Sequence, residues 1–339
     1  MYGRRNLVSD RIKTAQKHKK TRKGNTGGVK MPKQKNRTLT KMRRYWSLYL
    51  MLVPGILYLI VNNYLPLFGL TIAFKKVNYA VGILNSEWCG LKNFSFLFST
   101  KEAFLMFRNT IGYNLAFIFI GNAFGLLIAI TMDTVKNRFF KNVSQIIILF
   151  PYLLSIVIVT YIVFSFLSPS SGFMNQTILR FFGMEPVSWY NNPKPWPVIL
   201  VIVYIWMSFG YTSILYYSTL IGIDKSLYEA AAMDGAGSWQ QIKNVTIPCM
   251  RKIIIIMFIL AIGKICYSDF GLFYQVPMHS GMLQNVTQTI DTYVYTALLE
   301  QNNISRSAAA GFLQSMLGFV LVLITNKIVN RFDSESAMF

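Results

Sequence analysis

Ionisable side chains are scarce in this chain of 339 residues, and their scarcity disfavours several classes of protein. Only 14% of the residues are charged, whereas a typical soluble domain carries about a quarter. The 13 acidic residues are scattered, and the two histidines, His18 and His279, form no HExxH or His/Asp constellation. An integral membrane enzyme acting on lipid-linked glycans would need such groups gathered at one interface. That class therefore stays only as an alternative.

Cysteines and phosphate-binding motifs are also sparse. Cys89, Cys249 and Cys266 form no CxxC pair and no metal-ligand spacing, so we expect no metal site. The chain contains no GxxxxGK[ST] loop, because Gly263-Lys264 is followed by isoleucine and lacks the earlier glycine. We therefore predict that the chain is not an enzyme and binds no cofactor. ATP and magnesium, if used, would be held by a separate ATPase.

Apolar residues, in contrast, are abundant, since 53% of the chain is hydrophobic and the mean hydropathy is +0.39. Six apolar runs approach the roughly 20 residues that a helix needs to cross a bilayer. They cover residues 46–74, 110–132, 143–167, 197–221, 253–276 and 308–329. These runs predict an all-α integral membrane protein with six transmembrane helices. Lys264 and Asp269 interrupt the fifth run, and we expect its outer end to unwind.

Basic residues are concentrated at the start of the chain. Residues 1–44 hold 16 of the 34 lysines and arginines and lack an apolar core, so we expect a disordered tail rather than a secretory signal peptide. Such a tail orients a membrane protein by the positive-inside rule and can contact anionic lipid headgroups. Both termini, including the short tail 333–339, are therefore predicted to be cytoplasmic. The remaining positive charge is thinly spread, which argues against a nucleic-acid partner.

A polar stretch punctuated by glycine, SLYEAAAMDGAGSWQQIKNVTIP at 226–248, separates the fourth and fifth runs. Ser226 with Glu229, and Ser238 with Gln241, have the spacing of capping boxes. A Gly-Ala-Gly segment lies between the two boxes. We predict two short helices joined by a tight bend at glycines that can reach positive φ, the second helix ending at the final proline. With the N-terminus inside, this hairpin lies on the cytoplasmic side.

The same stretch resembles the EAA signature of the membrane subunits of bacterial ABC importers, E-A-A-x-x-x-G followed by nine residues and I-x-L-P. Valine replaces the usual isoleucine and isoleucine replaces the usual leucine, while the spacing is intact. The resemblance implies that the glutamate pairs with a basic residue of a partner ATPase; the alternative is that it only completes its capping box. The residues implied in ATPase coupling are Glu229, Ala230, Ala231, Asp234, Gly235, Ala236, Val245, Ile247 and Pro248.

Over residues 45–332 the chain is similar to carbohydrate importers of the maltose-permease class, particularly the LplB-like branch for oligosaccharides and polysaccharides. GLKNFSFLF, RNTIGYN, SGFMNQTIL, IDTYVYTALL and AAAGFLQSMLGFVLVLITNKIVNR carry this likeness, whereas residues 268–276 depart from it. It implies a type I ABC importer permease that moves a sugar across the bacterial cytoplasmic membrane. The implied partners are a second related permease subunit, an ABC ATPase dimer and an extracytoplasmic sugar-binding protein. A secondary transporter or ion channel, another alternative, would have no use for the EAA stretch.

Several residues are candidates for the substrate path. Counting from residue 253 places Lys264 about 16 Å deep, where a charge is costly unless it faces a polar cavity or a partner. Snorkelling, or a different helix boundary, is the alternative interpretation. Sugars bind to aromatic faces and hydrogen-bonding side chains. Residues of these types near the predicted mid-depth, each of which can equally be a packing residue, are Asn114, Asn122, Tyr152, Tyr161, Tyr204, Trp206, Tyr211 and Tyr267.

Overall fold

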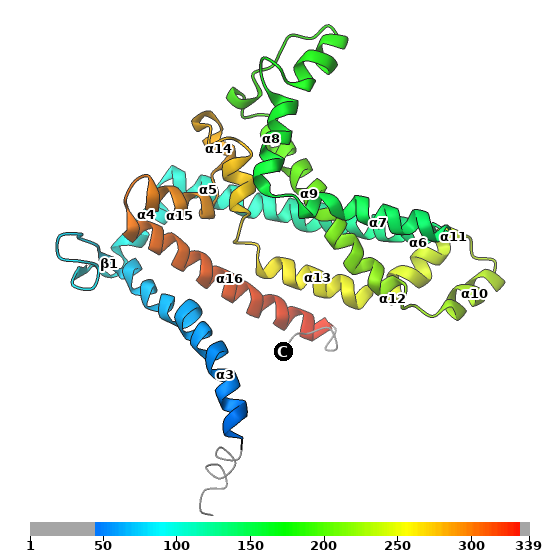
Figure 1. Cartoon of the computed structure of the whole chain (residues 1–339), viewed down its shortest axis with the longest axis horizontal. Helices are drawn as coiled ribbons and strands as arrows, with labels where there is room; N and C mark the ends of the chain where they lie inside the picture. The colour runs from blue at the N-terminus through cyan, green and yellow to red at the C-terminus, as the bar shows by residue number, and fades with distance from the viewer. Residues whose placement is uncertain (1–44, 333–339) are drawn as a thin grey trace, which may run out of the picture. The chain divides into compact units, whose positions relative to one another are not determined.

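A computed structural model describes residues 45–332. Residues 1–44 and 333–339 lie outside the described residues, so the expectations for both tails stay predictions. Within the described range the only strands are β1 (Lys75–Lys76) and β2 (Glu87–Trp88), which pair antiparallel with Lys75 opposite Trp88. The remaining regular structure of this range is helical (Figure 1). The prediction of a helical protein is confirmed for the described residues.

The chain divides into two units after Pro66. The described part of the first unit contains α3 (Trp46–Leu59) and the π-helical turn η1 (Ile60–Tyr64). The chain continues into the 3₁₀-helix η2 (Leu65–Phe74), and Trp46–Phe74 forms one apolar span of 29 residues. The helix changes type around Pro66 because a proline ring clashes with the carbonyl four residues earlier in a regular α-helix. The first apolar run is therefore helical over its predicted length.

In the second unit, three helical spans coincide with predicted runs. They are α5 (Lys101–Ala116) continued by η4 (Phe117–Gly121) and α6 (Asn122–Thr134), then α9 (Trp196–Leu220), and α16 (Ile304–Phe332). The first of these starts earlier than the predicted residue 110. The hydroxyl of Thr100 accepts a hydrogen bond from the N–H of Ala103 at 3.2 Å and caps the helix there.

The third run, predicted as a helix over 143–167, is broken into two helices. It forms α7 (Arg138–Leu153) and α8 (Ile156–Leu167), which meet at an angle of 94°. Leu154 and Ser155 are extended, and the Ser155 hydroxyl caps α8 by accepting from the N–H of Ile158. Pro151 lies in the last turn of α7, where proline weakens the helix. A sharp turn at a serine cap follows from this sequence.

The fifth run is also interrupted, as the sequence predicts, but its helix is shorter than 253–276. Here α13 (Arg251–Gly263) ends at Lys264, and helical structure resumes only in η8 (Gly271–Gln275). Four helical spans of the described chain are long enough to cross a membrane singly, or up to six if each of two bent pairs is one span. The second bent pair joins residues 238–249 to α13 at 61°. The described residues therefore contain four to six candidate spans, and the count of six transmembrane helices stays a prediction.

Short helices fill the connections. They are η3 (Gly90–Phe94), α4 (Ser95–Ser99), η5 (Met174–Leu179), η6 (Trp189–Asn191), η9 (Gly281–Leu283), α14 (Gln284–Thr287) and α15 (Ile290–Leu299), with α10 (Lys225–Met233), α11 (Ser238–Gln241), η7 (Ile242–Thr246) and α12 (Ile247–Cys249) between α9 and α13.

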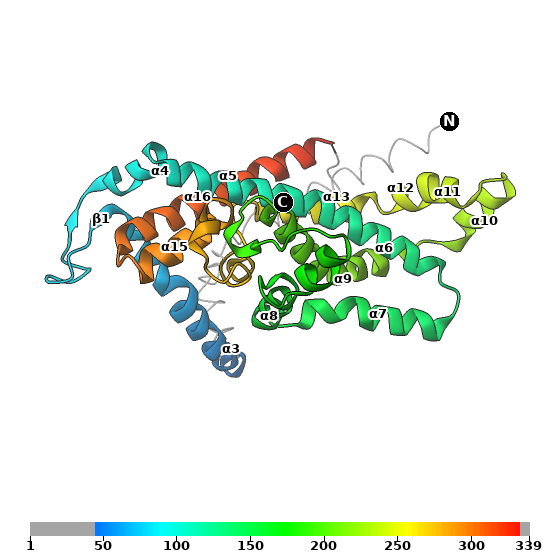
Figure 2. The same ribbon diagram turned by 90° about the horizontal axis from the view of Figure 1, so that it is seen from above.

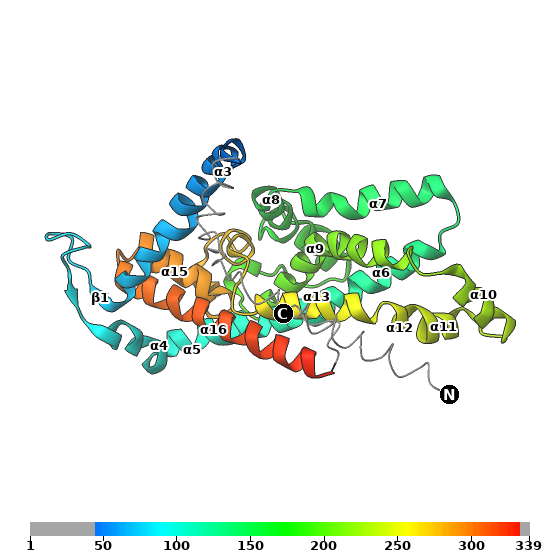
Figure 3. The same cartoon turned by 90° about the horizontal axis from the view of Figure 1, so that it is seen from below.

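In the second unit α9 packs along α6 and α7 (Figure 3). A Cβ atom at Gly210 of α9 would collide with the backbone of Ile148 in α7, so this close approach depends on glycine.

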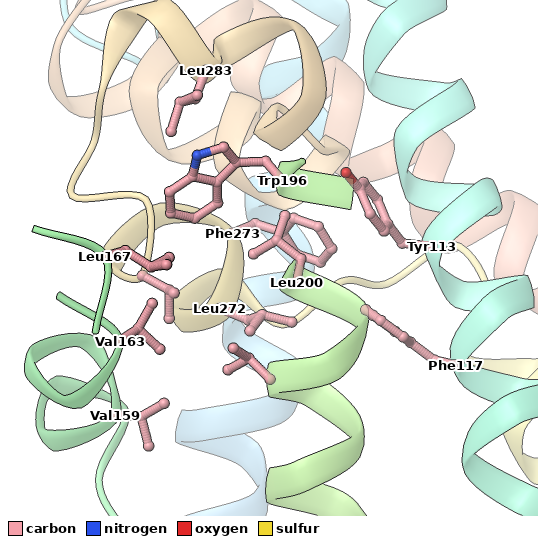
Figure 4. Close-up of a cluster of buried hydrophobic side chains, with 12 residues drawn as sticks. Tyr113, Phe117, Val159, Val163, Leu167, Trp196, Leu200, Leu272, Phe273 and Leu283 are labelled. Atoms are coloured by element: carbon pink, nitrogen blue, oxygen red, sulfur yellow. The ribbon is translucent and has the colours of Figure 1, made fainter. Parts of the chain in front are cut away.

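A cluster of buried side chains fixes α8, η8 and η9 against α9 and the α5–η4 segment (Figure 4). Trp196 and Leu200, in the first turns of α9, are completely buried within it. Phe273 of η8 packs against Tyr113 with ring centroids 4.8 Å apart. The segment that follows the break in the fifth run is thus held by a core rather than left as a free loop.

Candidate functional site

The polar stretch predicted from the sequence forms a helical hairpin, α10 to α12, at one end of the second unit in all three views (Figures 1, 2 and 3). Its first helix begins at Asp224, whose carboxylate accepts a hydrogen bond from the N–H of Ser226 at 3.0 Å. Hydrogen bonds from the N–H and the hydroxyl of Ser226 lower the pKa of Asp224. The predicted capping box of Ser226 with Glu229 is wrong, because Asp224, two residues earlier, is the N-cap of this helix.

The bend between the hairpin helices is a Schellman motif centred on Gly235. The N–H of Gly235 donates to the carbonyl of Ala232 at 3.0 Å, and the N–H of Ala236 donates to that of Ala231 at 2.9 Å. Gly235 has a φ of +79°, in the left-handed region that favours glycine. The predicted glycine bend is confirmed at this residue. Ala231 and Ala236 are half-buried on either side of it.

The second helix of the hairpin starts one residue before its predicted cap. Gly237 is the N-cap, and its N–H donates to the side-chain carbonyl of Gln240 at 2.9 Å, whereas Gln241 donates to the carbonyl of Ala236. The predicted box of Ser238 with Gln241 is therefore wrong. The helical segment runs through Pro248 to Cys249 before the chain turns into α13. Pro248 lies just after the π-helical turn η7, near the end of this segment.

The hairpin carries an exposed carboxylate and exposed apolar side chains. Within residues 45–332 the carboxylate of Glu229 makes no hydrogen bond and no ion pair, and the side chain is exposed. Met233 and Trp239 are 89% and 74% exposed. A hydrogen bond of 3.0 Å between the hydroxyls of Tyr228 and Thr246 ties the two arms together. An ordered shape with an unpaired charge and apolar flanks has the character of a docking surface for another protein.

The base of the hairpin is fixed to the helices of the second unit. Met250, at the turn into α13, is completely buried in a cluster with Ala129 of α6 and with Tyr216 and Leu220 of α9. Since protein interiors are close-packed, a force on the hairpin moves these helices rather than a flexible linker. The hairpin can therefore act as a lever.

Three of the predicted path residues are engaged in packing. Asn122 is 8% exposed, donates to the carbonyl of Ile118 and accepts from the hydroxyl of Tyr216 at 2.8 Å. Tyr204 stacks on Phe117 with ring centroids 3.7 Å apart. Trp206 is partly buried against the same cluster. These side chains have partners within the second unit.

The other path candidates are more open. Tyr152 and Tyr211 stack face to face at 4.8 Å and are each nearly half exposed, and Tyr161 is exposed as well. Lys264 and Tyr267 are exposed at the break after α13. Tyr152, with Tyr211 stacked on it, lies next to the break between α7 and α8, and Lys264 and Tyr267 lie at the break after α13. Irregular backbone in a membrane protein lines a cavity or is buried in protein at such places.

Side chains from three elements hold the break after α13. The amide of Asn114 donates to the carbonyls of Ile265 and Tyr267 at 3.0 and 2.9 Å. Asp291 accepts from the N–H of Ser268 at 2.6 Å, and Gln314 donates to the Cys266 carbonyl at 2.8 Å and to Asp291 at 3.0 Å. Sequence reasoning missed Asp291 and Gln314 because no local pattern links residues so far apart in the chain.

The described residues combine several helices long and apolar enough to cross a membrane with an exposed hairpin and a held break. Residues 121–334 match the family described as binding-protein-dependent transport system inner membrane component, and the chain belongs to this family. It is similar to the polygalacturonan/rhamnogalacturonan transport system permease protein YteP of Bacillus subtilis, with 34% identity over 89% of this chain and 93% of the relative. It is also similar to protein LplB of the same organism, with 33% identity over 88% and 92%.

Solved structures show the same arrangement. A bacterial ABC transporter involved in the import of the acidic polysaccharide alginate matches with a TM-score of 0.80 and 29% identity, covering 88% of this chain and 99% of that chain. A second structure, of the alginate transporter in complex with an alginate pentasaccharide-bound periplasmic protein, matches with a TM-score of 0.79. The chain is thus a transport permease subunit rather than an enzyme.

Proposed function

We propose that this chain is a permease subunit of an ATP-driven importer that carries an oligosaccharide or a fragment of a complex glycan. The relatives named for polygalacturonan, rhamnogalacturonan and galactooligosaccharides support a sugar substrate. The EAA stretch and the hairpin that it forms support coupling to a separate ATPase dimer, which would supply ATP and magnesium. The observation that carries this proposal is the unpaired, exposed Glu229 on a rigid hairpin.

The hairpin supports a mechanical form of coupling. A partner ATPase with a basic side chain in its cleft would pair with Glu229, and Met233 and Trp239 would bury apolar surface around this pair. When the ATPase closes on ATP, the buried base at Met250 transmits the movement to α6 and α9. The remaining motif residues shape the surface, with Ala230 and Asp234 exposed and Val245 half-buried.

The proposed assembly contains a second permease subunit and an extracytoplasmic sugar-binding protein. The binding-protein-dependent family and the alginate complex with its periplasmic protein support the latter partner. We place the chain in the bacterial cytoplasmic membrane, surrounded by lipid, with both termini and the hairpin in the cytoplasm. In this assembly Lys264 and Tyr267, at the break after α13, face the substrate path.

Replacing Glu229→Gln tests the coupling role, because it removes the charge and keeps the size. With the assembled transporter in proteoliposomes, we expect sugar uptake per ATP hydrolysed to fall at least 10-fold, equivalent to about 1.4 kcal/mol of lost coupling. Asp133→Asn is the matched control, since Asp133 is an exposed acid at the end of α6 with one long ion pair of 3.8 Å to Lys141. Unchanged coupling in Glu229→Gln, with intact assembly, would refute the proposal.

A further inference from the structure

A polar pocket with a volume of about 190 Å³ is lined by residues of η8, η9, α14, α15 and the segments next to them. Its wall is formed by amides and hydroxyls, including those of Gln284, Gln288, Thr292 and Thr296. Its rim carries Tyr274, His279 and Glu300. None of these residues belongs to the predicted substrate path, and the coupling role of the hairpin does not use them.

One carboxylate oxygen of Glu300, at the rim, is contacted by two side chains. The Tyr274 hydroxyl donates to Oε1 of Glu300 at 3.1 Å, and Nε2 of His279 lies 3.3 Å from the same atom. The other oxygen of Glu300 makes no hydrogen bond within residues 45–332. About two-fifths of the Glu300 side chain is exposed. A fixed carboxylate with a free acceptor oxygen therefore borders the pocket.

The backbone at the rim adopts a strained conformation that the surrounding contacts hold in place. Met278 and His279 have φ values of +52° and +51°, in the left-handed region that residues other than glycine rarely adopt. The His279 ring packs on Tyr274 with centroids 4.4 Å apart, and the hydroxyl of Ser280 donates to the carbonyl of Tyr190 at 2.9 Å. Strain of this kind concentrates at binding sites, where it positions side chains in advance.

The lining matches the chemistry of an uncharged sugar. Amides, hydroxyls and a carboxylate donate to and accept from sugar hydroxyls, and the volume is below the roughly 300–1,000 Å³ of pockets that enclose a drug-sized ligand. The pocket therefore suits one sugar ring and not a whole oligosaccharide. Among the described residues no lysine or arginine lines it, and Glu300 would repel the carboxylate of a uronic acid.

We infer that this pocket is a subsite for one neutral sugar residue at the end of the incoming oligosaccharide. The inference rests on the proposed function and deepens it, because it separates this chain's substrate from a purely acidic polysaccharide. Glu300 accepts from a sugar hydroxyl through its free oxygen, and Gln284 and Thr296 complete the set of polar contacts.

Binding of defined tetrasaccharides to the assembled transporter in nanodiscs tests the inference. The probes are three neutral tetrasaccharides (β-1,4-galactotetraose, α-1,5-arabinotetraose and maltotetraose) and the acidic tetragalacturonate, measured by calorimetry. We expect at least one neutral probe to bind, with an affinity at least 10-fold above that of tetragalacturonate. Glu300→Ala and Thr296→Trp, which fills the pocket, should each lower the affinity for the neutral probe at least 10-fold. Glu300→Gln should reduce the ratio of the affinity for the neutral probe to that for tetragalacturonate.

Glu185→Gln is the control, because Glu185 is an exposed acid of the segment between α8 and α9 and does not line the pocket. Thr296→Ser, which keeps the hydroxyl, should bind as the natural chain does. No binding of any neutral probe, tighter binding of tetragalacturonate, or unchanged affinity in Thr296→Trp would each overturn the inference. If Glu229→Gln still uncouples ATP hydrolysis from uptake in that case, the pocket assignment fails while the proposed function stands.

Discussion

The hydrogen bond between Tyr216 and Asn122 allows a quantitative test of how the hairpin's base is held. Tyr216→Phe would remove the only donor to the side-chain oxygen of Asn122 among residues 45–332, at 2.8 Å. The amide of Asn122 is already engaged with the carbonyl of Ile118, so the oxygen cannot turn to another partner without losing that bond. Tyr216 is 1% exposed, and water cannot replace the missing hydroxyl.

Two magnitudes bear on the size of this effect. Leaving a buried acceptor unpaired costs about 1–3 kcal/mol in soluble proteins, whereas hydrogen bonds between membrane helices average about 0.6 and reach about 1.7 kcal/mol. Because both groups are buried between α6 and α9, we expect a value toward the upper end of the membrane range. The predicted coupling energy is therefore about 1–1.5 kcal/mol.

A double-mutant cycle measures this coupling. Tyr216→Phe, Asn122→Leu and the double variant would be unfolded by denaturing detergent, and the free energies of unfolding compared. The double variant should be less destabilised than the sum of the single variants, because the orphaned partner is removed. A coupling energy near zero would refute the reasoning. Loss of sugar uptake in a stable Asn122→Leu variant would instead place Asn122 on the substrate path.

Three further predictions concern the hairpin and the break. Gly235→Val should destabilise the hairpin by about 1–2 kcal/mol and reduce coupled uptake. Gly235→Asn should change both the stability and the uptake less, because asparagine tolerates positive φ. Hydrogen exchange of α10 measures the stability, and equal effects of the two variants would contradict the prediction. Asn114→Leu should lower the free energy of unfolding by about 1–3 kcal/mol, since two carbonyls at the break lose their donor. The melting temperature of the assembled complex checks this, and an unchanged value would contradict it. The lowered pKa of Asp224 means that its cap is fully present above the ordinary value of 3.8 and is lost as the pH falls through the lower value of the folded hairpin. Protection factors of α10 should therefore stay constant from about pH 8 to 5, and a decline within that range would exclude this cap.

The family and the positions of the apolar runs followed from the sequence, because both depend on local patterns. Most of each apolar run is helical, since the backbone groups of a membrane segment must be paired, although the third and fifth runs are broken. The glycine of the bend could likewise be predicted, because positive φ at Gly235 is a requirement of the residue itself. The spacing of the EAA stretch was enough to indicate a coupling loop.

Only the tertiary structure decided which polar groups are partners. Both serine capping boxes were plausible by spacing, yet Asp224 and Gly237 start the helices. The break after α13 depends on Asn114 and on Asp291 with Gln314, which packing brings together from distant parts of the chain. The same holds for Tyr274, His279 and Glu300 at the rim of the pocket. Hydrogen bonds between remote residues leave no periodic signal. Most of the helices and the bend of the hairpin could therefore be predicted from the sequence, whereas the contacts that hold them were decided by the fold.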